Sequence, residues 1–163
     1  MTNAAPPAPK VPPEAVRTHE FTTKSDADTV EVGHKLVKLL KPPQLLILRG
    51  ELGTGKTTLV KGIAEALDAA EAAEVTSPTF TLIHEYDGTR DGKPVKLFHL
   101  DVYRLEGERQ LETLGLDELL TDDALVLVEW GEKFKSIRKK ATGEIAITSA
   151  GGDARKLTVT LKE

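Results

Sequence analysis

Apolar positions along the chain change their spacing several times, and each change predicts a new element. Residues 45–48 and 125–128 are apolar at every position, which is typical of strands buried on both faces of a sheet. Spacing of three and four residues predicts helices at 30–40 and 59–67, and a mostly polar helix at 108–120. Alternation of apolar and polar residues predicts further strands at 18–22, 77–86, 96–104, 144–148 and 157–161.

Turn and capping residues mark where these elements begin and end. Ser25 is a predicted helix N-cap, with Asp28 three residues on as in a capping box. Pro42-Pro43 closes the same helix, and Gly151-Gly152 predicts the turn between the last two strands. The hairpin connection predicted over 87–94 contains Asp87-Gly88, Asp91-Gly92 and Pro94. Strands that alternate with helices indicate an α/β fold, whose sheet has a parallel centre and antiparallel additions.

Residues 50–58 contain the most informative motif. They read Gly-Glu-Leu-Gly-Thr-Gly-Lys-Thr-Thr, which matches G-x-x-x-x-G-K-[ST], and they lie between the strand at 45–48 and the helix at 59–67. In this context glycines let backbone N–H groups surround a phosphate chain, and the helix N-terminus faces the same anion. Lys56 can reach the β- and γ-phosphates, and the Thr57 hydroxyl can join a Mg²⁺ shell. A chance glycine-rich turn is the alternative, and the flanking strand and helix count against it. The predicted fold is a P-loop NTPase-like three-layer sandwich.

An aspartate in the strand predicted at 96–104 is a candidate for metal or water positioning. Alternation places His99, Asp101 and Tyr103 on one face of that strand. A mid-strand carboxylate in apolar company is costly unless a charged group pairs with it, and Mg²⁺ would be such a group. The alternative is a carboxylate that is exposed at a sheet edge or bridged to Arg104.

A second acid follows the apolar run at 125–128. Glu129 stands at the carboxyl end of that predicted strand, which is where ligands bind in open α/β sheets. It resembles a Walker B element with Glu in place of the usual Asp. Trp130, the only tryptophan, comes next and is either a core or rim aromatic or a neighbour of the nucleotide.

Three hydroxyl side chains share one face of the strand predicted at 77–86. They are Ser77, Thr79 and Thr81, and Pro78 stiffens the start of the segment. One interpretation is a switch-like segment that meets the γ-phosphate or its metal. The other is that threonine is common in strands. Both interpretations remain open at this point.

Composition limits the possible classes of protein. The 163 residues include 39% hydrophobic and 29% charged residues and no cysteine, which excludes disulfides, cysteine–zinc sites and thiol chemistry. The longest apolar runs are far short of the ~20 residues that span a bilayer. A net charge of −4 argues against a protein that grips nucleic acid by itself. The charged residues at 106–123 are acidic apart from Arg109, and those at 133–140 are all basic, which indicates either ordinary solvated faces or an acidic docking surface beside a basic one that contacts a polyanion.

The first residues differ in composition from the rest. Residues 1–15 are rich in proline and alanine, which predicts a disordered tail, and they contain no apolar core of a secretory signal. We therefore expect a cytoplasmic protein with a single ATPase domain over 16–163.

Four motifs in order resemble one known family. The segments at 50–58 and 77–82 are followed by His-Leu-Asp-Val-Tyr-Arg at 99–104 and Leu-Val-Glu-Trp at 127–130. This series resembles the TsaE (YjeE) family of small bacterial ATPases of tRNA threonylcarbamoyladenosine biosynthesis. The resemblance runs from about residue 18 to the C-terminus. Its first motif is widespread, whereas the Ser-Pro-Thr and Glu-Trp elements in this order are far more restrictive.

The resemblance implies a Mg²⁺-dependent ATPase that binds ATP. Its catalytic residues would be Lys56, Asp101 and Glu129, with Thr57 and Glu129 binding Mg²⁺ and Asp101 supporting the metal or the attacking water. Trp130 would neighbour the nucleotide. The phosphates would be held by Gly53, Thr54, Gly55, Lys56, Thr57 and Thr58.

The resemblance also implies partners and a role. The ATPase would join the TsaD and TsaB heterodimer, meet tRNA only through that complex, and reset the complex between turnovers. The complex modifies the adenosine beside the anticodon. The adenine of ATP would contact the segment at 23–25 and the Gly151-Gly152 turn.

Rival functions are weighed by the motifs they require. A GTPase is disfavoured because Asn3 is the only asparagine, so N-K-x-D is impossible, and no D-x-x-G occurs. A small-molecule kinase would need an acceptor pocket and a cationic lid, which Arg104, Arg109 and residues 133–140 could supply. A nucleotide-gated binding module with incidental hydrolysis is the third possibility.

Overall fold

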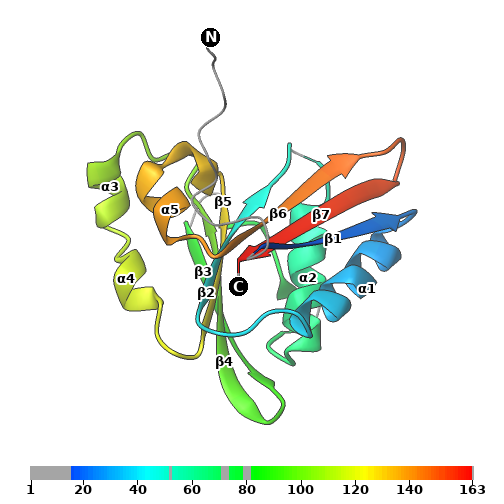
Figure 1. Cartoon of the computed structure of the whole chain (residues 1–163), viewed down its shortest axis with the longest axis horizontal. Helices are drawn as coiled ribbons and strands as arrows, with labels where there is room; N and C mark the ends of the chain where they lie inside the picture. Colours follow the sequence, from blue (N-terminus) through cyan, green and yellow to red (C-terminus); the bar gives the residue numbers. More distant parts are fainter. Residues whose placement is uncertain (1–15, 52, 71–73, 79–81, 163) are drawn as a thin grey trace.

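The computed structural model describes residues 16–51, 53–70, 74–78 and 82–162. The predicted tail at 1–15, and Thr79 and Thr81 of the hydroxyl segment, lie outside the described residues. In chain order the elements are β1 Val16–Thr23, α1 Asp26–Val37, β2 Gln44–Arg49, α2 Lys56–Ala66, β3 Ile83–Arg90, β4 Lys93–Asp101, α3 Glu108–Glu112, α4 Leu116–Leu119, β5 Ala124–Glu129, the 3₁₀ helix η3 Gly131–Lys133, α5 Lys135–Lys140, β6 Gly143–Ser149 and β7 Arg155–Lys162 (Figure 1).

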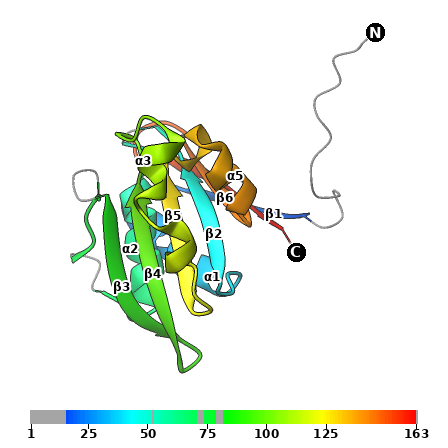
Figure 2. The same cartoon turned by 90° about the vertical axis from the view of Figure 1, so that its left-hand side faces the viewer.

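The strands form a mixed sheet in the order β1-β7-β6-β2-β5-β4-β3. The central strands β6, β2, β5 and β4 are parallel to one another, while β3 and the β1–β7 pair add antiparallel strands at the two edges. Helices α1 and α2 cover one face of the sheet, and α3, α4 and α5 lie on the other (Figures 1 and 2). The predicted α/β class and its parallel centre with antiparallel additions are confirmed.

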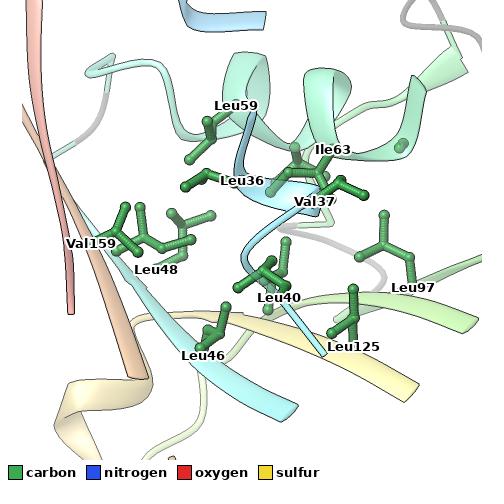
Figure 3. Packing of buried hydrophobic residues seen from close by; sticks show 14 of the residues in the cluster. Leu36, Val37, Leu40, Leu46, Leu48, Leu59, Ile63, Leu97, Leu125 and Val159 are labelled. Carbon is green, nitrogen blue, oxygen red and sulfur yellow. The ribbon is translucent and has the colours of Figure 1, made fainter. Parts of the chain in front are cut away.

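Both faces of the central strands are buried. In β2, Leu46 and Leu48 pack with the α1 and α2 side, whereas Leu45 and Ile47 belong to the cluster on the opposite face. Figure 3 shows the first cluster, in which Leu36 of α1 and Leu59 of α2 lie near Leu48. Each such side chain stabilises the fold by about 1.5–3 kcal/mol through burial. The uninterrupted apolar runs therefore have the structural role that their pattern predicts.

Helices α1 and α2 touch through two glycines. A Cβ added to Gly33 would lie 2.7 Å from the Gly62 backbone, and one added to Gly62 would lie 2.1 Å from the Val30 carbonyl oxygen. The helix axes approach closely because neither residue has a side chain. Glycine is unfavourable inside a helix, so this contact explains its presence in both.

The start of α1 agrees with its predicted cap. The Ser25 hydroxyl oxygen accepts the N–H of Asp28 at 3.1 Å. The Asp28 carboxylate accepts the N–H of Lys24 at 3.0 Å, one residue earlier than in a standard capping box. Both contacts satisfy backbone donors at the entry to the helix.

The β3–β4 hairpin differs from its prediction. Strand β3 begins at Ile83 and continues through Asp87-Gly88, and the turn is Asp91-Gly92 alone, with φ values of 52° and 79°. Gly88 is a packing glycine, since a Cβ there would lie 2.5 Å from the Leu67 carbonyl oxygen. Strand β4 ends at Asp101, three residues before the predicted end.

The helix predicted at 108–120 is divided. Gly115, at φ 66°, separates α3 from α4 because its left-handed conformation interrupts the helical path. Helix α5 at Lys135–Lys140 was not predicted, and among its residues only Ile137 is buried. No helix in the described ranges is both long and apolar enough to cross a membrane.

Candidate functional site

The glycine-rich loop connects the end of β2 to the start of α2. A Cβ on Gly50 would lie 2.6 Å from the Thr54 hydroxyl oxygen and 2.8 Å from the Ile147 carbonyl oxygen, so a side chain has no room there. Gly53 and Gly55 adopt φ values of 80° and 99°, which other residues rarely adopt. The motif's glycines are thus required by packing at one position and by backbone conformation at two.

The loop is closed by its own hydrogen bonds. Thr54 donates both its N–H and its hydroxyl to the Glu51 carbonyl oxygen, at 3.2 and 2.7 Å. Helix α2 begins directly afterwards, with Thr57 and Thr58 in its first turn. The first N–H groups of a helix have no partner inside it, so this end of α2 favours an anion.

Lys56 lies between the loop and the neighbouring strand. Its ammonium donates to the Gly50 carbonyl oxygen at 2.6 Å and lies 3.3 Å from Glu129 Oε1. Glu129 is the last residue of β5, which runs parallel to β2 and pairs Leu48 with Glu129. The parallel register brings the motif lysine and the predicted acid together at the carboxyl ends of the strands.

Glu129 has a second partner that the sequence prediction did not use. His99 of β4 is fully buried, and its Nε2 lies 2.5 Å from Glu129 Oε2. His99 Nδ1 has no hydrogen-bond partner within the described residues. Burial by itself raises the pKa of Glu129, but the hydrogen bond and charge of His99, together with Lys56, hold this pKa below its ordinary value. The carboxylate is therefore ionised at neutral pH.

Asp101 lies beside Glu129 on the adjacent strand. The two residues are partners in the parallel β4–β5 register, and Asp101 is 5% exposed. Since β3 forms the edge of the sheet, the predicted alternative of an exposed edge carboxylate is wrong. The Asp101 Oδ1 atom accepts the N–H of Tyr103 at 2.9 Å. Because β4 ends at Asp101, Tyr103 leaves the face predicted for it and is 55% exposed.

Trp130 lies against the motif lysine. The Lys56 ammonium is 5.0 Å from the centre of the indole ring, and the centre of the Tyr103 ring is 5.0 Å from the indole. Lys133 donates to the Tyr103 carbonyl oxygen at 2.6 Å, which ties this segment to η3. A change of charge near the Lys56 ammonium would therefore change the surroundings of the Trp130 indole. This is what we expect of a tryptophan beside a phosphate site.

The carboxylates at this edge suit a cation that shares its ligands with phosphate. Mg²⁺ typically takes one or two carboxylates together with phosphate oxygens and water. Glu129, Asp101 and the Thr57 hydroxyl are the candidate protein ligands. No group of three or more His, Cys, Asp or Glu residues in the described part of the chain is arranged to hold a metal alone. Mg²⁺ held by these candidate ligands would take its remaining ligands from phosphate oxygens and water.

Arg155, at the start of β7, is a site neighbour that sequence reasoning missed. It donates from Nε to the Thr54 carbonyl oxygen at 2.8 Å and from Nη2 to the Gly53 carbonyl oxygen at 3.1 Å. It is also the register partner of Thr23 in β1. Because Arg155 also donates to the Gly152 carbonyl oxygen at 2.7 Å, the two segments predicted for the adenine, 23–25 and Gly151-Gly152, lie near one another and near the loop. Only the strand pairing could reveal this, because no local motif contains Arg155.

Comparisons with known proteins identify relatives that match this chain over most of its length. The family model described as threonylcarbamoyl adenosine biosynthesis protein TsaE matches residues 23–157. The chain is 39% identical to the tRNA threonylcarbamoyladenosine biosynthesis protein TsaE of Bacillus subtilis over 86% of this chain and 84% of the relative. It is 41% identical to the protein of the same name from Streptomyces coelicolor over 80% of this chain and 88% of the relative.

A solved structure agrees with these relatives. The crystal structure of Bacillus subtilis YdiB superposes with a TM-score of 0.64 at 33% identity and covers 91% of this chain and 88% of that one. The range that the family model matches, residues 23–157, contains the loop, both acids and the tryptophan. The chain belongs to the TsaE family.

Proposed function

We propose that this chain is a Mg²⁺-dependent ATPase that acts in the biosynthesis of threonylcarbamoyladenosine in tRNA. The observation that carries the proposal is the position of the Lys56 ammonium, 2.6 Å from the Gly50 carbonyl oxygen and 3.3 Å from Glu129 at the carboxyl ends of parallel strands. The names of the relatives supply the pathway. The protein would work in the cytoplasm with TsaD and TsaB, and would meet tRNA through that complex.

Each site residue has a defined task in this proposal. The N–H groups of residues 53–58 and the Lys56 ammonium hold the β- and γ-phosphates of ATP. Thr57, Glu129 and Asp101 would hold Mg²⁺, which neutralises charge on the phosphate oxygens when bound. Glu129 or Asp101 also orients the water that attacks the γ-phosphorus, so that ADP leaves with the electrons of the broken P–O bond.

The proposed function is tested by ATP turnover with and without partners. We expect slow release of phosphate by the purified chain, and an increase when TsaD and TsaB are added together, because the ATP cycle serves their complex. Co-purification with TsaD and TsaB in the presence and absence of ATP tests the association itself. Transfer of phosphate to a small-molecule acceptor would instead favour a kinase, and turnover indifferent to both partners would contradict the assigned role.

The single tryptophan should report nucleotide binding directly. Since the Trp130 ring lies 5.0 Å from the Lys56 ammonium, saturating Mg-ATP should change its fluorescence as the ammonium moves to the phosphates. No other tryptophan contributes to the signal. Titration at 295 nm excitation measures the change, with adenosine as the control that lacks phosphates. An unchanged spectrum under saturating Mg-ATP counts against the placement of Trp130 beside the nucleotide.

A further inference from the structure

The guanidinium of Arg155 joins two loops that are far apart in the sequence. Besides the Thr54 and Gly53 carbonyl oxygens of the glycine-rich loop, it contacts the turn between β6 and β7. Its Nη1 atom donates to the carbonyl oxygens of Gly152 at 2.7 Å and Ala154 at 2.8 Å. One side chain therefore uses all three of its nitrogens on backbone oxygens from both loops.

These contacts determine how the loop's peptide groups are oriented. In a planar trans peptide the N–H points opposite to the C=O. Because Arg155 holds the Thr54 carbonyl, the N–H of Gly55 is directed to the opposite side, away from the guanidinium. The N–H of Thr54 is meanwhile retained by the Glu51 carbonyl at 3.2 Å. Glycine at positions 53 and 55 leaves the loop backbone flexible. A restraint from outside the loop, such as the Arg155 hydrogen bonds, therefore helps to keep its peptide groups in this orientation.

The positive charge of Arg155 also favours anion binding at the glycine-rich loop. Its acceptors in the two loops are neutral carbonyl oxygens, so the guanidinium keeps its positive charge next to the loop. The guanidinium therefore favours an anion that is bound at the loop. Its partly buried position weakens the screening of this charge by salt. The fork of the guanidinium also suits several acceptors at once, which a lysine ammonium at the same position could not reach.

We propose that Arg155 is a positioning residue that holds the glycine-rich loop in the conformation that binds a nucleoside triphosphate and couples this loop to the β6–β7 turn. The inference rests on the proposed ATP site and deepens it. Arg155 need not touch the phosphates, since it acts through the carbonyl oxygens of Gly53 and Thr54.

The next residue in β7 provides a matched control. Lys156 carries the same charge but is exposed, and its ammonium lies 4.0 Å from Glu20 on β1. Isothermal titration with Mg-ATP should show at least tenfold weaker binding for Arg155→Gln, with Lys156→Gln close to the wild-type protein. Arg155→Lys, which keeps the charge without the fork, should lie between the two. Equal affinities in the wild type, Arg155→Gln and Arg155→Lys would overturn the proposal, as would an equal loss in Lys156→Gln.

A measurement without nucleotide separates this inference from the proposed function. Hydrogen exchange of the Thr54 N–H in the nucleotide-free protein should be at least tenfold faster in Arg155→Gln than in Lys156→Gln. If wild-type protein bound no ATP, the ATPase proposal would fail while this comparison still tested the restraint. Should Arg155→Gln not fold, Arg155→Lys decides, because wild-type exchange and wild-type affinity in that variant would contradict the positioning role.

Discussion

Replacement of Lys56 with alanine is expected to abolish ATP turnover. The substitution removes the charge that meets the β- and γ-phosphates, and loss of one preorganised electrostatic contact typically slows a reaction by about 10²–10³-fold. The same change breaks the buried pair with Glu129, in which both side chains are nearly inaccessible. Removal of one partner of such a pair destabilises a protein by about 3–5 kcal/mol. Steady-state phosphate release measures the first effect and urea unfolding the second.

Lys61 supplies the control for this experiment. It lies on the same helix, α2, one turn beyond the loop, so Lys61→Ala removes the same charge from the same element. We expect this variant to keep wild-type turnover and nearly wild-type stability. Turnover should be compared only under conditions in which unfolding curves show Lys56→Ala to be folded. Near-normal turnover by folded Lys56→Ala protein would refute the role assigned to this lysine.

Glu129→Gln should retain nucleotide binding but lose Mg²⁺-dependent hydrolysis by about a hundredfold or more. The amide has the shape of the carboxylate but carries no charge for a cation, and an amide is a poorer Mg²⁺ ligand. The buried Lys56 ammonium also loses its ionised neighbour at 3.3 Å. Phosphate release over a range of Mg²⁺ concentrations measures the loss, and ATP binding in EDTA measures what is retained.

A nearby glutamate provides a control for the loss of one negative charge in this part of the protein. Glu132 lies three residues farther on in η3, where its carboxylate is 3.8 Å from the Arg49 guanidinium. Glu132→Gln should leave the Mg²⁺ dependence unchanged. A Glu129→Gln protein with wild-type turnover and an unaltered Mg²⁺ optimum would show that this carboxylate does not serve the metal.

The parts of the fold that depend on local pattern could be predicted from the sequence. The runs at 45–48 and 125–128 are apolar at every position, which is typical of a strand between two helix layers. The motif at 50–58 specifies a loop between a strand and a helix, and both are present. Since the acid after each central strand must lie at its carboxyl end, the proximity of Glu129 to Lys56 was also predictable. The catalytic and ligand roles of these residues stay predictions until the experiments above are done.

The sequence-based predictions failed or were incomplete where the role of a residue depends on neighbours that are distant in the sequence. Asp87-Gly88 and Asp91-Gly92 look alike as turn signals, but Gly88 is required by the approach of the Leu67 carbonyl. The roles of His99 and Arg155 likewise depend on strand register. His99 meets Glu129 only because β4 lies beside β5, and Arg155 reaches the loop only because β7 lies beside β6. Local spacing contains no information on these pairings.

The pairing of β1 with β7 has a consequence for biosynthesis. Val16 and Lys162 are register partners, so the earliest described strand cannot be completed until the last one has left the ribosome. Contacts between distant parts of a chain form slowly, because a large loop must close first. A nascent chain that stalls before β7 would leave β1 without its strand partner, expose the edge of β6 and lack Arg155. Premature termination before β7 would thus remove the strand partner of β1 and a restraint on the glycine-rich loop in a single event.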